Sequence, residues 1–174
     1  MAFKSRDWHG LLQQVWLANA LDGLVVIEGE ASDDFCQLMF EVIRRWRVLP
    51  PPQHPKVVIQ CPEGSSQSWN LAHALARIDC DTYARREAGS AGLWLFLAGQ
   101  ERICRPETAF TFHGNLYRMQ GWGPTNEMRA EWLASRTGGE VAFWLELCER
   151  DTVTTFGAED ALAWGVATGV SEVW

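Results

Sequence analysis

One serine of the sequence stands in a setting that suits nucleophilic chemistry. Ser90 lies in the segment Glu87-Ala88-Gly89-Ser90-Ala91-Gly92, directly before a strongly apolar stretch. A serine hydroxyl is a weak nucleophile at neutral pH, so it needs a base to accept its proton and donors to hold the oxyanion formed on attack. Small neighbours would leave the hydroxyl accessible. The alternative is that this Gly-Ser-Ala-Gly turn is only a helix start.

Two further residues could complete such a site. His113 ends the stretch Phe110-Thr111-Phe112, and histidine is the side chain best suited to act as a general base near neutral pH. Asp151 follows Glu149-Arg150 and could orient the imidazole and balance its charge. For both residues an ordinary polar role at the end of an element is the alternative, and spacing alone does not decide between them.

A second turn could supply hydrogen-bond donors. The segment Cys61-Pro62-Glu63-Gly64-Ser65-Ser66 follows a run of apolar residues and precedes a predicted helix. It lacks the Gly-Lys-Ser/Thr ending of a phosphate-binding loop, so nucleotide binding is not expected there. Helix starts at the carboxyl ends of parallel strands present unpaired N–H groups, and the two turns together could therefore form an anion hole.

Length and composition exclude several classes of protein. The chain has 174 residues and a net charge of −7, which suits one globular domain and disfavours nucleic acid as the partner. That length leaves no room for an ATP-driven motor beside a catalytic domain. No apolar run approaches the roughly 18 residues of a membrane span, and the first residues lack an apolar signal core. We therefore expect a soluble protein that is not exported.

The cysteines and histidines give no sign of a metal or redox centre. The five cysteines are widely spaced, odd in number and contain no Cys-x-x-Cys pair. They are Cys36, Cys61, Cys80, Cys104 and Cys148. His9, His54 and His73 have no ligand partner at a useful spacing. We expect no metal site, no cofactor and a reducing cytoplasmic location.

The hydrophobic pattern predicts an α/β fold. Apolar residues recur with helical spacing after the capping residue Ser32, at Phe35, Leu38, Met39, Val42, Ile43 and Trp46. Further helices are expected over Gln67–Ile78, Ala91–Ala98, Pro124–Ser135, about 141–148 and Ala158–Trp164. Strands are expected over Leu24–Ile27, Val57–Gln60, Thr82–Arg86, Arg102–Cys104, Ala109–His113 and Thr152–Phe156. Alternation of strands and helices is typical of a largely parallel sheet.

With these motifs in this order, residues 23–170 resemble the proteolytic subunit of the Clp protease (ClpP), a serine peptidase with the ClpP/crotonase fold. The stretch from Val57 to Ser65 is similar to the family's strand and Ser-Pro-Gly-Gly turn, and the Ser90 turn is similar to its Ala-Ala-Ser-Met-Gly nucleophile turn. The segments Phe112-His113, Glu149-Arg150-Asp151 and Ala158 to Val166 follow with family-like spacing.

The resemblance implies a fold and a mechanism. The fold would be a single ClpP-like domain over residues 1–174, with repeated β-β-α units, an N-terminal segment over 1–22 and a shortened helical handle over about 114–149. Ser90 would be the nucleophile, His113 the general base and Asp151 its orienting acid. The backbone N–H groups of Gly64 and Ala91 would form the oxyanion hole. The enzyme would be a serine endopeptidase that cleaves unfolded protein or peptide.

The resemblance also implies partners. The subunits would assemble with one another into a ring, a heptamer being one candidate size, and a separate AAA+ ATPase unfoldase would deliver the substrate. Nucleic acid and membrane are not expected partners.

Two departures from the family keep other functions open. Glu63 replaces the first glycine of the family's turn and places a carboxylate near the expected oxyanion site, and the segment between His113 and Asp151 is shorter than in the family. A weakly active or inactive ClpP-like subunit that assembles with an active paralogue is therefore one alternative. A crotonase-like acyl-thioester enzyme that uses the Gly64 and Ala91 N–H pair is another.

Overall fold

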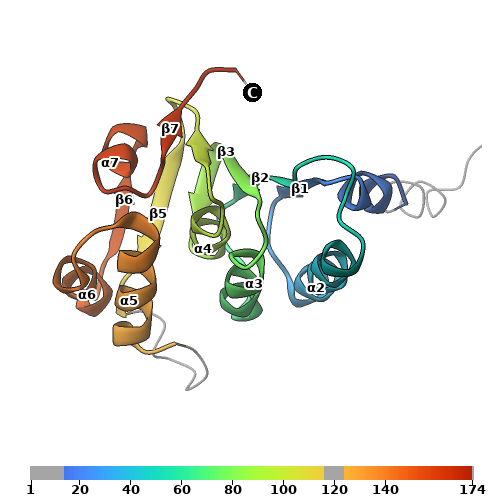
Figure 1. The fold of residues 1–174 in the computed structure, drawn as a ribbon. Helices are drawn as coiled ribbons and strands as arrows, with labels where there is room; N and C mark the ends of the chain where they lie inside the picture. Colours follow the sequence, from blue (N-terminus) through green and yellow to red (C-terminus); the bar gives the residue numbers. More distant parts are fainter. Residues whose placement is uncertain (1–13, 116–123, 174) are drawn as a thin grey trace, which may run out of the picture.

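The described residues form a mixed α/β structure around a mostly parallel sheet, as the sequence predicts (Figure 1). It is a computed structural model that describes residues 14–115 and 124–173. Five parallel strands lie side by side in the order β1 (Leu24–Glu28), β2 (Lys56–Cys61), β3 (Asp81–Gly89), β4 (Arg102–Cys104) and β7 (Gly169–Val170). β5 (Ala109–His113) also pairs with β3, and β6 (Val153–Phe156) runs antiparallel to β5.

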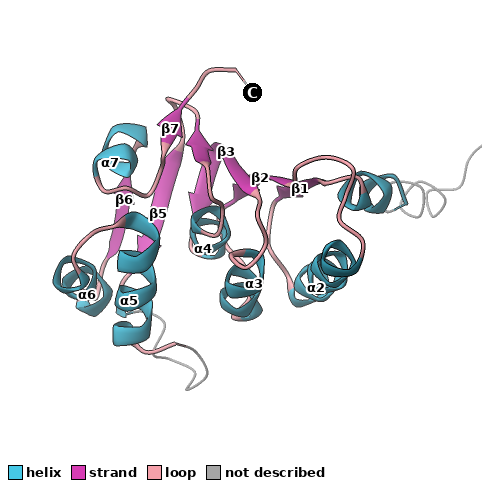
Figure 2. Cartoon of the chain, in the orientation of Figure 1, coloured by secondary structure: helices cyan, strands magenta, loops and turns pink. Residues whose placement is uncertain are grey.

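The helices cover one side of this sheet. α2 (Asp33–Val48), α3 (Gln67–Leu75), α4 (Ala91–Leu97) and α5 (Asn126–Thr137) follow one another across it, each in contact with the next (Figure 2). α6 (Val141–Glu149) packs against α5, while α7 (Ala158–Ala163) contacts β5 and β7. Every residue of α4 is buried, so this helix forms the centre of the core. None of the described helices is both long and apolar enough to cross a lipid bilayer.

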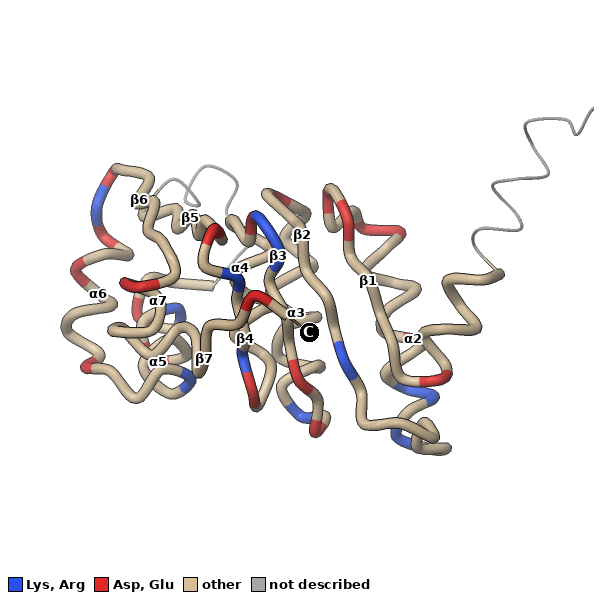
Figure 3. Tube along the Cα trace, turned by 90° about the horizontal axis from the view of Figure 1, so that it is seen from above, with Lys and Arg blue, Asp and Glu red and all other residues tan. Residues whose placement is uncertain are grey.

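The ends of α2 show why this sequence forms a helix at this place. The hydroxyl of Ser32 accepts a hydrogen bond from the Phe35 N–H at 3.3 Å, which satisfies one of the free donors of the first turn. Acidic residues occupy the first turn and basic residues the last turn, so both ends complement the helix dipole. Figure 3 shows this separation, with acidic residues in red at the start of α2 and basic residues in blue at its end.

Residues 14–21 are helical, which the sequence did not indicate. Two tryptophans attach this helix to the rest of the fold. The indole N–H of Trp16 donates to the Val26 carbonyl at 2.9 Å, and that of Trp46 donates to the Ala20 carbonyl at 2.9 Å. Contacts with residues outside this helix therefore hold it in place. Such contacts leave no periodic pattern among the eight residues of the helix itself.

Two other differences concern the sheet and the expected handle. β3 continues through Glu87–Gly89, residues assigned above to a turn, because this part pairs with β5 after β4 has ended. β7 is a short strand that the sequence did not predict. The region expected to form a shortened handle contains α5 and α6. Residues 116–123 of this region lie outside the described residues.

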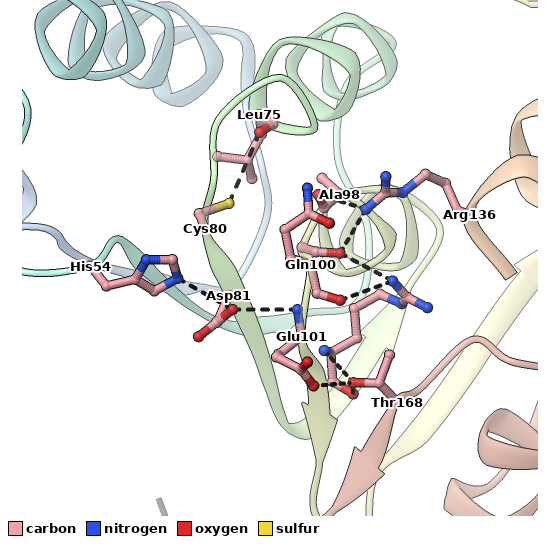
Figure 4. A network of polar contacts seen from close by, with 11 residues as sticks. His54, Leu75, Cys80, Asp81, Ala98, Gln100, Glu101, Arg136 and Thr168 are labelled. Carbon is pink, nitrogen blue, oxygen red and sulfur yellow. Dashed lines mark hydrogen bonds and ion pairs between the residues drawn. The ribbon is translucent and has the colours of Figure 1, made fainter.

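Two arginines fasten the C-terminal end of α4, opposite the end that carries Ser90. Arg136 donates to the carbonyls of Leu97, Ala98 and Gly99. Figure 4 shows the bond from Arg136 to Ala98. Arg102 is 7% exposed and also donates to the carbonyl of Gly99, at 3.1 Å. These bonds satisfy carbonyls that have no partner within the last turn of the helix. Two guanidinium groups therefore hold the C-terminal end of α4 in place.

Candidate active site

Ser90 has the most unusual backbone conformation of the described residues. It joins β3 to α4 with φ 46° and ψ −108°, and it is the only non-glycine residue with positive φ in the described part of the chain. A residue with a Cβ is strained in this region, by about 1–3 kcal/mol. The same kind of sharp strand-to-helix turn holds the nucleophile of many serine hydrolases clear of the backbone. The Ser90 turn is similar to such a turn in its backbone strain and in its position between a strand and a helix.

Pairing of the strands brings Ser90 level with the end of β5. Gly89 is the register partner of Thr111, and the Ser90 N–H donates to the Thr111 carbonyl at 2.9 Å. His113 therefore ends the strand beside Ser90. The side chains of Phe110 and Phe112 are buried, and alternation along the strand directs His113 to the opposite side.

Three glycines allow the two turns to pack directly on each other. A Cβ on Gly64 would lie 2.7 Å from the Ala31 carbonyl oxygen and 2.8 Å from the Cβ of Ala91. A Cβ on Gly89 would lie 2.6 Å from the Pro62 carbonyl oxygen, and one on Gly92 would overlap the Cys61 carbonyl. No larger residue fits at these places without a shift of the backbone. The expected oxyanion residues Gly64 and Ala91 are consequently neighbours.

The backbone N–H groups of these two residues are free of the regular hydrogen-bond ladders. Ala91 is the first residue of α4, where N–H groups have no acceptor within the helix. Gly64 forms a parallel bridge with Ala31 that uses the Glu63 carbonyl and the Ser65 N–H, at 3.1 and 2.9 Å. The bridge leaves the N–H of Gly64 outside it. Within the part of the chain that the structure describes, these two N–H groups thus lie outside the helix and strand ladders.

Asp151 lies across from the end of β5. The Gly114 N–H donates to the Thr152 carbonyl at 3.1 Å, and the Asn115 N–H donates to the Arg150 carbonyl at 2.7 Å. The exposed Asp151 carboxylate accepts a hydrogen bond from the Asn115 amide at 3.0 Å. Ser90, His113 and Asp151 therefore come from three adjacent strand ends. The hydrogen bond to the Asp151 carboxylate thus comes from Asn115 and not from the His113 imidazole.

The side chain of Glu63 is exposed, while its backbone is fixed. Its carbonyl accepts hydrogen bonds from the Ala31 N–H and from the Cys61 thiol, the latter at 3.0 Å. An exposed carboxylate is screened by water, which weakens its repulsion of a nearby oxyanion. The substitution at this position is thus compatible with an anion hole.

The nearby thiols are not competing nucleophiles. Burial raises the pKa of the Cys61 thiol and also that of the Cys36 thiol, which lies 3.7 Å from the Ser68 hydroxyl. A thiol with a raised pKa is protonated at neutral pH and reacts slowly. Among the described residues, no group of three or more His, Cys, Asp and Glu side chains is placed to hold a metal ion.

Three polar residues near the site were not identified from the sequence. Asn115, Asn126 and Arg129 form hydrogen bonds around His113 and Asp151. Asn115 could have been found from its position two residues after His113. For Arg129 the sequence gives only a weak indication. It lies three residues after Asn126, on the helix face that also carries Trp132 and Leu133.

Comparison with known proteins adds evidence about the fold. No protein-family model matches the chain, and no curated protein sequence matches it. The crystal structure of a peptidase from Plasmodium falciparum is similar, with a TM-score of 0.76 and 11% sequence identity. The match covers 90% of this chain and 99% of that chain. At this identity the likeness establishes a shared fold over nearly the whole length of both chains.

Proposed function

We propose that this protein is a Clp-type serine peptidase subunit with Ser90 as its nucleophile. The observation that carries the proposal is the strained Ser90 turn, packed through Gly64 and Ala91 against a second turn that offers a free N–H group. A strained conformation persists only when its surroundings enforce it, and such sites cluster where function requires them. The fold shared with a solved peptidase supports the same class of reaction.

The proposed reaction begins with acylation of the enzyme. Ser90 Oγ attacks the peptide carbonyl carbon while the His113 imidazole accepts the hydroxyl proton. The carbonyl oxygen becomes an oxyanion that the Gly64 and Ala91 N–H groups stabilise. The C–N bond then breaks, and the proton held on His113 passes to the leaving amine.

Deacylation repeats this sequence with water. His113 accepts a proton from a water molecule, whose oxygen attacks the acyl carbon, and the same proton returns to Ser90 Oγ as the ester bond breaks. Asp151 would orient the imidazole once it turns from Asn115 toward His113. Catalytic hydrogen bonds are often loose in the absence of substrate, so the observed position of Asp151 is compatible with this role.

The proposed function includes an assembly of identical subunits and a partner ATPase. The subunit would be a single domain that associates with copies of itself into a cytoplasmic ring, with a shortened handle between Gly114 and Glu149. A separate AAA+ ATPase would unfold the substrate protein. The five cysteines are buried and unpaired, as expected in a reducing compartment.

Hydrolysis of short fluorogenic peptides by the purified assembly tests the activity. We expect Ser90→Ala to reduce turnover about 10⁴–10⁶-fold, because a triad acts as a unit. Ser171→Ala, which changes a serine near the C-terminus, is the control and should keep the wild-type rate. Equal turnover by wild type and Ser90→Ala would refute the proposal.

A non-catalytic ring subunit is the second candidate. It is favoured by the hydrogen bond that holds the Asp151 carboxylate on Asn115 rather than on His113. This candidate predicts that the protein co-purifies with an active paralogue. It also predicts that Ser90→Ala leaves the activity of such mixed rings unchanged, whereas the peptidase proposal predicts a loss.

A further inference from the structure

Arg129 is a charged residue in the core. It lies on α5 and is only 1% exposed. Its guanidinium carbon lies 5.1 Å from the centre of the Phe112 ring and 5.8 Å from that of the Trp94 ring. Burial of a charge costs several kcal/mol unless polar groups and aromatic faces compensate for the lost water. The compensating groups therefore indicate what this arginine does.

The guanidinium donates to the backbone at the end of β5. Its Nη1 donates to the Gly114 carbonyl at 2.9 Å, and its Nη2 donates to the His113 carbonyl. On the other edge of this segment, the Gly114 N–H donates to the carbonyl of Thr152, in the segment that precedes β6. The proposed catalytic base thus sits on backbone that is held from two sides.

The same arginine is linked to the proposed catalytic acid. Its Nη1 also donates to the Asn126 amide oxygen at 3.3 Å. The Asn126 amide nitrogen donates to Asn115 at 3.4 Å, and Asn115 donates to the Asp151 carboxylate at 3.0 Å. A continuous chain of hydrogen bonds therefore runs from Arg129 to Asp151.

We propose that Arg129 is a positioning residue that aligns His113 and Asp151 for attack by Ser90; this rests on the proposed peptidase function. In this role Arg129 acts through the backbone of His113 and Gly114. A guanidinium suits the task because its planar fork donates in several directions while its faces lie against aromatic rings. The compact ammonium of a lysine cannot reproduce that fork.

The test measures covalent labelling of Ser90 by a fluorophosphonate at increasing reagent concentrations. This yields the labelled fraction, the maximal rate constant and the half-saturating concentration. Arg129→Met removes the donors and keeps the length of the side chain. We expect its maximal rate constant to fall about 10–100-fold, as for a small misplacement of a catalytic group. The labelled fraction and the half-saturating concentration should stay at their wild-type values, and Arg129→Lys should be intermediate.

Arg136→Met is a matched control. Arg136 lies on the same helix and also donates to backbone carbonyls, but at the far end of α4. We expect this variant to lose thermal stability and to retain the wild-type labelling rate constant.

The outcomes separate the inference from the function on which it rests. If wild type is not labelled at Ser90, the proposed function fails. If wild type is labelled and Arg129→Met reacts with the wild-type rate constant, even with a smaller labelled fraction, Arg129 is only structural and the inference is wrong. Should both Arg129 variants fail to fold, Asn126→Ala breaks the link to Asn115 and leaves the guanidinium buried. A wild-type rate constant in Asn126→Ala would then overturn the inference.

Discussion

The site depends at the residue scale on a strained serine and on glycines that admit close backbone contact. Ser90 keeps a positive φ because its N–H is bonded to β5 and because Ala91 begins a buried helix. Gly64 lets the second turn lie close to Ala91, because a Cβ at Gly64 would come within 2.8 Å of the Ala91 Cβ. Both features are local, and each can be changed by a single substitution.

Gly64→Ala should separate the two turns. Its added methyl would meet the Ala31 carbonyl at 2.7 Å and the Ala91 Cβ at 2.8 Å, so the backbone must move. We expect the free energy of unfolding, measured in urea, to fall by about 1–3 kcal/mol, together with a loss of peptide hydrolysis. Gly157→Ala is the control, since a Cβ there meets no atom within 4 Å and φ is −96°. Equal stability of the two variants would contradict this account of the turns.

The decisive feature at the scale of elements is the change of partner along β3. Its first half pairs with β4, and Glu87–Gly89 pair with β5, which carries His113 to the side of Ser90. At the other end of α4 from Ser90, Arg102 joins this helix to the segment after α7, through the carbonyls of Gly165 and Val166 at 3.0 and 2.8 Å.

Arg102→Met should destabilise the fold strongly. The substitution leaves the carbonyls of Gly165 and Val166 without their guanidinium donors. We expect a loss of about 3 kcal/mol in the free energy of unfolding. The exposed Arg47 provides the control, because Arg47→Met should change stability by no more than about 0.5 kcal/mol. A similar small change for Arg102→Met would show that these hydrogen bonds contribute little.

The sequence predicts most elements and less of the site. Periodic apolar residues and the Ser32 cap suffice for α2, because that information is local. The same is true of the turn containing Ser90. The helix over 14–21, strand β7 and the bonds from Arg129 to His113 depend on residues distant in the sequence, and no periodic pattern encodes them. The positions of His113 and Asp151 agree with adjacent strand ends, whereas their roles remain predictions.

The proposal requires, at the scale of the whole molecule, that one subunit be part of a larger assembly. Large apolar side chains are exposed on residues 14–21 and the start of β1, including Leu21 at 41% and Leu24 at 42%. Their clustering next to α2 is consistent with a contact between subunits. The net charge of −7 disfavours unspecific association.

Sedimentation analysis should reveal a ring rather than a single subunit of 19.6 kDa. We expect the double variant Leu21→Glu, Leu24→Glu to dissociate, because the introduced carboxylates would have to be buried in the contact. A wild-type protein that sediments as a monomer at micromolar concentration would contradict the proposed ring, while the nucleophile assignment would stand on its own test.

Peptide mapping by mass spectrometry after fluorophosphonate treatment determines directly whether Ser90 is the nucleophile. We expect one adduct, on the peptide that contains Ser90, in wild type and in Ser171→Ala, and none in Ser90→Ala. An adduct that persists in Ser90→Ala, or folded wild-type protein that stays unmodified at Ser90, would contradict the claim that Ser90 is the nucleophile of a peptidase.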